Sequence, residues 1–309
     1  MTRAFACALL AWSLILGAVA PALADTAVGW IDELQGGSAD FRLLRGGQPQ
    51  VVSLFAPVFA GDEIQVQGEN SVLVLGLGQE EFLNVTAAES PFMVPAPGLA
   101  PTLADNLLSW AGNGFANLER TAAVTVNASS RGYGESGNLC PDLDNVDRLS
   151  APLLKGGPHA LLPGQRALRL SWRGGYGPYT VRLVRSADSK VLLEASDVRS
   201  TDFSAQPVNL EPGEHVLTIE DIGGLTLSTI LDVQEMNALP PLPAELANTS
   251  LPKTSLVLME AAWLSSMENE RWRFEAYQML AAHEDYQPAQ LLRQAMECGF
   301  TFGPPPARH

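Results

Sequence analysis

Basic side chains are scarce in this chain of 309 residues. Lysine and arginine together number 19, against 34 aspartates and glutamates, so the formal net charge is −15. Nucleic acids and anionic membranes are bound through a basic footprint, and this composition therefore argues against both as partners. It leaves neutral or basic partners, although an acid excess can also serve only to keep an exported protein in solution.

Histidine and cysteine are scarce too, with four and three residues. No two of them stand at the spacing of a metal-binding pair, and the sequence holds no G-x-S-x-G, S-x-x-K or P-loop motif. The acids within 142–147 alternate as calcium ligands would, but Asp147 and Leu153 stand where an EF-hand needs glycine and glutamate, which favours a polar turn. We therefore expect no catalytic residue, no metal and no cofactor, and hence a protein that is not an enzyme.

Long apolar runs are confined to the N-terminus. Arg3 precedes an apolar stretch over residues 4–20, and Ala22 and Ala24 follow it. A stretch of about 17 residues is short for a membrane helix, which needs roughly 20, whereas the two alanines form an A-x-A cleavage site. We expect a signal peptide that is cleaved after Ala24, export of the mature chain, and no membrane span within it.

Two cysteines remain after this cleavage, Cys140 and Cys298. In an oxidising compartment two thiols usually form one bridge. We therefore expect a Cys140–Cys298 disulfide that ties the middle of the chain to its last helix.

Short β-strands dominate the region that follows the signal peptide. Apolar or alternating segments occur at residues 28–31, 39–43, 51–55, 62–66, 71–75 and 81–85, and glycines separate them. This pattern predicts a small all-β domain over residues 25–95. Gly61-Asp62-Glu63-Ile64 before a polar turn, followed by an apolar strand, a second turn and a last strand, resembles the FecR-like periplasmic domain. The resemblance implies a bacterial periplasmic protein that senses or binds and does no chemistry.

Residues 96–157 change character and predict a linker with some local structure. Leu103 to Leu118 shows loosely helical spacing that Gly112-Asn113-Gly114 interrupts, which predicts a short helix and then a loop. Residues 121–127 are strand-like, and residues 129–137 are too rich in serine and glycine for either element.

A second β unit is predicted over residues 158–236, with alternating strands near 167–172, 179–184, 191–193, 215–219 and 225–233. The turn from Leu210 to His215 is similar to one found in many bacterial immunoglobulin-like modules. That resemblance implies a β-sandwich with a binding or spacer role and with Trp172 in the core between its sheets. The glycine-rich segment from Gly174 to Tyr179 predicts a wide loop between strands, in preference to a carbohydrate or peptide surface that presents two tyrosines.

Helical periodicity appears after a Pro-rich linker over residues 237–252. Leu256, Met259, Trp263 and Met267 share one stripe, residues 268–270 break it, and further helices follow over 272–282 and from Pro288 onward. Trp263, Tyr277 and Pro288 are similar in kind and order to positions of a tetratricopeptide helix pair. A single such pair cannot bury its own apolar face, so it must pack on a β unit or on another protein. Trp263, Trp272 and Tyr277 are therefore the expected partner contacts.

The expected fold is mostly β with a C-terminal α unit. The chain divides into a signal peptide (1–24), a FecR-like β domain (25–95), a partly structured linker (96–157), an immunoglobulin-like sandwich (158–236), a Pro-rich linker (237–252), a helical hairpin with a capping helix (253–300) and a tail (301–309). The expected function is that of a periplasmic, non-enzymatic binding or scaffold protein for other envelope proteins, with envelope signalling or sensing as the process that it would serve. The alternative is an accessory, carbohydrate- or peptidoglycan-binding subunit of an envelope hydrolase.

Overall fold

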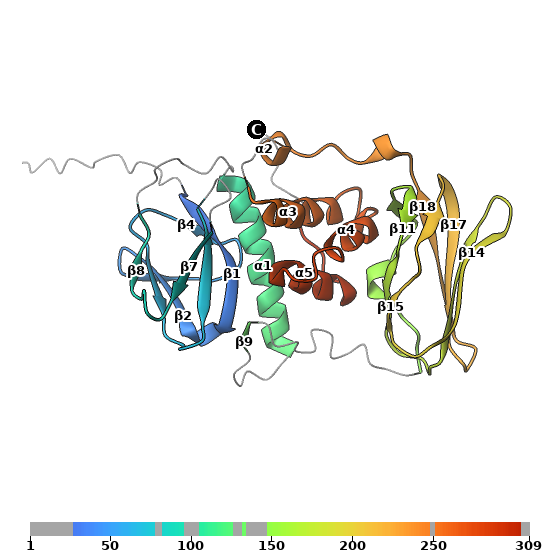
Figure 1. Ribbon diagram of the computed structural model, residues 1–309, viewed down its shortest axis with the longest axis horizontal. Helices are drawn as coiled ribbons and strands as arrows, with labels where there is room; N and C mark the ends of the chain where they lie inside the picture. The colour runs from blue at the N-terminus through green and yellow to red at the C-terminus, as the bar shows by residue number, and fades with distance from the viewer. Residues whose placement is uncertain are drawn as a thin grey trace, which may run out of the picture.

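The protein is built from two β units with helices between them (Figure 1). The computed structural model describes residues 27–77, 82–95, 105–125, 132–133, 147–247 and 251–303. The predicted fold class, mostly β with a C-terminal helical unit, is confirmed. Within these ranges, no helix has the length and apolar character that crossing a membrane requires.

The first β unit consists of two small sheets around one core. One sheet has the order β4-β1-β6-β7, with β9 added on β1, and the other has the order β3-β2-β5-β8. Inward positions such as Trp30, Leu34, Ile64 and Leu73 are fully buried, as the alternating strands require. The strands are β1 (Gly29–Gly37), β2 (Phe41–Arg45), β3 (Gln48–Gln50), β4 (Pro57–Val58), β5 (Glu63–Val66), β6 (Val72–Gly76), β7 (Phe82–Thr86), β8 (Phe92–Met93) and β9 (Gly132–Tyr133).

The second β unit is a sandwich. Its larger sheet has the order β10-β18-β17-β13-β14, in which β10 runs parallel to β18 and the other pairs are antiparallel. The pairs β11-β16 and β12-β15 form the other layer. Trp172 is buried and meets the Tyr179 ring edge-on at 5.2 Å, so its predicted place in the core is confirmed. The strands are β10 (His159–Leu161), β11 (Gly164–Arg166), β12 (Arg169–Ser171), β13 (Tyr179–Arg185), β14 (Lys190–Val198), β15 (Asp202–Ser204), β16 (Val208–Leu210), β17 (Gly213–Glu220) and β18 (Thr226–Val233).

A long helix, α1 (Asp105–Thr125), occupies much of the predicted linker. The predicted break at Gly112 and Gly114, and the strand-like reading of residues 121–127, are wrong for the part that α1 covers. Tertiary packing explains the difference, because both glycines lie where the helix meets other elements. A Cβ on Gly112 would lie 2.9 Å from the Phe55 carbonyl oxygen, and one on Gly114 would lie 2.1 Å from the Phe302 ring. The glycines that lower helix propensity thus permit close approach.

The C-terminal helices follow the predicted order and fill the space between the β units (Figure 1). Residues 268–270, where the predicted stripe breaks, form a turn in which all three residues have positive φ. The helices are α2 (Ala244–Ala247), α3 (Lys253–Ser265), α4 (Arg273–Leu280) and α5 (Gln287–Glu297). The helical unit, defined here as α3 to α5, therefore packs on both β units of its own chain.

Candidate functional site

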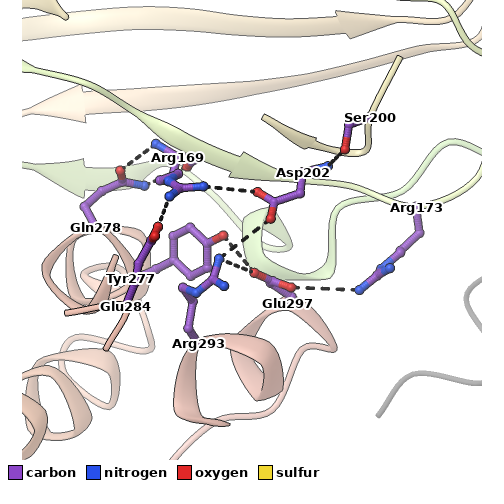
Figure 2. A network of polar contacts seen from close by, with 9 residues as sticks. All are labelled: Arg169, Arg173, Ser200, Asp202, Tyr277, Gln278, Glu284, Arg293 and Glu297. Atoms are coloured by element: carbon purple, nitrogen blue, oxygen red, sulfur yellow. Dashed lines mark hydrogen bonds and ion pairs between the residues drawn. The ribbon is translucent and has the colours of Figure 1, made fainter. Parts of the chain in front are cut away.

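A polar network joins the sandwich to the helical unit (Figure 2). The sandwich contributes Arg169 from β12, Arg173 just after it, and Asp202 from β15. The helical unit contributes residues of α4, of α5 and of the segment between them. These residues are Tyr277, Gln278, Glu284, Arg293 and Glu297.

Glu297, at the end of α5, is the most buried acid of this network. The Tyr277 hydroxyl donates a hydrogen bond of 2.8 Å to its Oε1, Arg293 Nη1 lies 3.3 Å from the same oxygen, and Arg173 Nη2 lies 3.8 Å from Oε2. Burial raises the pKa of Glu297 against the opposing effect of the tyrosine and the arginines. Burial, together with the charge of Glu297, also raises the pKa of Tyr277, so its hydroxyl stays protonated and donates.

Arg169 holds the other half of the network. Its guanidinium pairs with Glu284 and lies 3.8 Å from Asp202. Its backbone is matched by the side-chain amide of Gln278, which accepts from the Arg169 N–H and donates to the Arg169 carbonyl, both at 2.9 Å. A glutamine on α4 thus makes the two backbone bonds that a neighbouring strand would make.

Two more buried side chains strengthen the same boundary. Glu275 accepts from the Leu162 backbone N–H at 3.0 Å and pairs with Arg166 at 2.5 Å. Arg273 donates to the carbonyls of Pro152 and Leu153 at 2.9 Å, which caps the turn before β10. Every buried acid named so far on this side of the helical unit therefore faces an arginine.

The boundary with the first β unit has a different chemistry. Asp32, in β1, is 1% exposed, and its Oδ1 accepts from Trp30 Nε1 at 2.9 Å, Ser255 Oγ at 2.8 Å and the Tyr286 hydroxyl at 3.0 Å. Ser255 lies on α3 and Tyr286 directly precedes α5. Among the ion pairs of the described ranges, none includes Asp32. Burial raises the pKa of this carboxyl, although the three donors oppose the shift.

Both arrangements hold elements of the fold together. Their acids pair with arginines or accept hydrogen bonds from neutral donors, and the Ser255 hydroxyl donates to the Asp32 carboxylate. No residue of either arrangement is thus placed as a nucleophile beside a base. Within the described part of the chain, no group of three or more histidine, cysteine, aspartate or glutamate side chains could hold a metal ion.

The side chains predicted to contact a partner do not lie on the surface. Trp263, Trp272 and Tyr277 are all buried in the helical unit's own core, and Tyr277 also belongs to the network of Figure 2. With 4%, 1% and 0% of their surface exposed, none of the three is available at the surface, and this burial weakens their assignment as partner contacts. Cys298 directly follows α5, whereas Cys140 lies outside the described residues, so the Cys140–Cys298 disulfide stays a prediction.

Sequence reasoning missed Asp32, Ser255, Tyr286 and Glu297. The sequence held little signal for Asp32, since the same strand also contains the polar residues Glu33 and Gln35. None existed for its partners, because Ser255 is 223 positions away and Tyr286 is 254 positions away.

In comparisons with known proteins, no protein-family model, curated protein or solved structure matches this chain.

Proposed function

We propose that this chain is a non-enzymatic periplasmic protein that binds another protein of the envelope and scaffolds it. The observation that carries the proposal is the double attachment of the helical unit, through Asp32 to the first β unit and through Glu275, Gln278 and Glu297 to the sandwich. Both β units are thereby held in one body, with a continuous apolar core across both boundaries. A body of this kind can present one surface on each β unit to a partner at a fixed separation.

The family resemblances belong to this proposal. The two-sheet architecture of residues 27–95 suits a FecR-like domain, which senses or binds. The sandwich suits an immunoglobulin-like module, since two layers of short, mostly antiparallel strands enclose a core that contains the buried Trp172. Export after cleavage behind Ala24 places both modules in an oxidising compartment, where the Cys140–Cys298 bridge would form.

The test is capture from the native envelope. The mature chain, carrying an affinity tag at its C-terminus, is expressed with its own signal peptide, cross-linked in cells and purified under denaturing conditions. We expect one or a few envelope proteins in stoichiometric amounts, and Asp25 as the first residue of the purified chain. A chain that still begins at Met1, or that cross-links to nothing, would overturn the proposal.

One observation favours the alternative, a peptidoglycan- or carbohydrate-binding accessory subunit. Of the two tyrosines in the loop Gly174–Tyr179, Tyr179 is buried but Tyr176 is 53% exposed, as a ring that stacks on a sugar would be. Tryptophan fluorescence reports poorly here, because Trp30, Trp172 and Trp272 are buried. Co-sedimentation with isolated peptidoglycan is the better test, and binding that Tyr176→Ala abolishes would favour the alternative over the scaffold.

A further inference from the structure

A buried histidine lies where the sandwich meets the helical unit. His159, the first residue of β10, is 2% exposed, and its ring meets that of Phe274 on α4 edge-on, with the ring centroids 6.4 Å apart. Directly beside it, the Ala160 N–H donates to the Arg271 carbonyl at 2.8 Å. The imidazole therefore stands between the edge strand of the larger sheet and the helix that packs on it.

Neither ring nitrogen of His159 has a hydrogen-bond partner among the described residues, and both are buried. The chain passes close over the ring, since a Cβ on Gly157 would lie 3.2 Å from its Nε2. In such a setting the neutral imidazole is favoured. A proton on it would be a buried charge without an acceptor, which is costly to keep away from water.

The charged group that acts on His159 from α4 is a cation. Arg273 is buried and donates to the carbonyls of Pro152 and Leu153, so its guanidinium cannot move away without losing these bonds. Burial lowers the pKa of His159 from its ordinary value of 6.5, and the charge of Arg273 adds to the shift. The Leu154 backbone, which lies near the ring without forming a hydrogen bond, opposes it.

The acids around this position already pair with arginines. These ion pairs are Glu270–Arg273 and Glu275–Arg166 on the side of α4, and Asp232–Arg271 on the side of β18. Lys155, in the turn before β10, is a further cation and is exposed. A proton on His159 would therefore add to the local positive charge and would not complete an ion pair.

A second buried histidine, His215 on β17, shares a face of the sheet with His159. Both are register partners of Leu231, in the strand between them. One ring nitrogen of His215 has a partner, because its Nδ1 lies 3.0 Å from the Gly213 carbonyl oxygen. His215 also lies two strands further into the sheet than the edge strand β10. Of the two histidines, His159 is the one whose charge acts directly on the contact with α4.

The boundary with the first β unit responds to acid in the opposite sense. Burial raises the pKa of Asp32, so acid favours the protonated form that this boundary prefers. At the sandwich boundary, burial raises the pKa of Glu297 too, so this acid opposes the effect of His159 where it takes up its own proton. A comparison of His159 variants removes the contributions of both acids, because these are the same in each variant.

We propose that His159 is an acid switch that releases α4 from β10 and leaves the helical unit attached to the first β unit. Above pH 6.5 the neutral ring stays enclosed and the contact is complete. As the pH falls below this value, the open form takes up a proton that the closed form resists, and water solvates the charge. No partner takes part in the switch, so it operates whatever the chain binds.

The test is amide hydrogen exchange of the purified protein, corrected for the intrinsic pH dependence of exchange. The reporters are the Ala160 and Leu162 amides, which donate to the Arg271 carbonyl and the Glu275 carboxylate. From about pH 7.5 to about pH 5.5 their protection should fall several-fold, with about tenfold as the limit for uptake of one proton. The amides of Leu217 in β17 and Leu258 in α3 should keep their protection.

The variants assign this response to one ring. His159→Phe and His159→Gln cannot take up a proton, and both should make the protection of Ala160 and Leu162 independent of pH in this range. The second variant decides the matter if the first does not fold. The controls are His215→Phe and His283→Gln, which changes a partly exposed histidine between α4 and α5, and both should keep the response.

Three outcomes overturn the proposal. The first is an unchanged chain whose Ala160 and Leu162 amides keep their protection in acid. The second is an acid response that survives in a folded His159 variant or is lost in His215→Phe instead. The third is an equal loss of protection at Leu217 and Leu258, because acid would then unfold the whole protein and not release one helix.

Discussion

The Ser255 hydroxyl in α3 donates to Oδ1 of Asp32 in β1 at 2.8 Å and so joins residues 223 positions apart. Trp30 and Tyr286 donate to the same oxygen, which makes one buried atom the polar centre of the boundary between the first β unit and the helical unit.

The first prediction concerns that atom. Asp32→Ala leaves three buried donors without their acceptor and should lower the free energy of unfolding by about 2 to 4 kcal/mol. Asp32→Asn keeps an acceptor oxygen at the same place and should change it by less than about 1 kcal/mol. Urea unfolding of the two variants at neutral pH makes the comparison. Equal losses in both would show that the charge, and not the acceptor, supports the boundary.

The second prediction is a pH dependence with an unusual sign. Because burial raises the pKa of Asp32 above its ordinary value of 3.8, the folded state favours the protonated acid. The stability that this group contributes is therefore present below pH 3.8 and is lost as the pH rises through the folded pKa. Relative to the unchanged chain, Asp32→Asn should gain in thermal midpoint between about pH 4 and about pH 7. A difference that is constant with pH would contradict the shift.

The third prediction concerns the sandwich boundary. Gln278→Leu keeps the size of a buried side chain but removes both of its bonds to the Arg169 backbone, so it should cost about 2 to 4 kcal/mol in urea unfolding. Gln278→Glu, which keeps an acceptor for the N–H but loses the donor, should also destabilise the protein. A loss of under about 0.5 kcal/mol for the leucine variant would mean that water replaces the amide.

The fourth prediction tests the role of glycine in α1. Gly112→Ala should raise helix propensity by about 1 kcal/mol, yet its Cβ would lie 2.9 Å from the backbone oxygen of Phe55, which cannot rotate away. We expect a net loss of about 1 to 3 kcal/mol, because the helix must shift. Asn113→Ala, at the exposed neighbouring position, is the control and should be neutral or slightly stabilising. A stabilising Gly112→Ala would refute close packing at this point.

The fifth prediction is the Cys140–Cys298 bridge. In the chain-entropy model, closing a loop of about 160 residues raises the free energy of unfolding by roughly 5 kcal/mol at most. Reduction, or Cys298→Ser, should therefore lower the midpoint of thermal unfolding of protein purified from an oxidising compartment. Maleimide titration of the unreduced, denatured chain should find no free thiol, and finding two would exclude the bridge.

Most strands and helices could be predicted because their periodicities are local, but the strand predicted over residues 51–55 is wrong, since β3 ends at Gln50 and β4 begins at Pro57. Alternation gave the β13 and β17 segments, and the stripe through Met259 and Trp263 gave α3. What failed depends on distant neighbours. Gly112 and Gly114 suggest a helix break until Phe55 and Phe302 are placed against them, since propensity is a weak prior that packing overrides.

The same limit applies to the site. An exposed and a covered tryptophan look alike in sequence, so Trp263 and Trp272 could be predicted to be anchors, whereas the structure buries both. The importance of Asp32 depends equally on Ser255 and Tyr286, which no local pattern connects to it.

The position of the helical unit at the end of the sequence affects how the protein assembles during biosynthesis. Both β units precede it in sequence, yet α3 to α5 form the piece that lies between them. During synthesis the two β units emerge first, with the surfaces that they later share with the helices uncovered. A chain cut short before residue 253 would carry both β units and lack what joins them. Completion of the polypeptide is therefore the event that turns two separate folding units into one body.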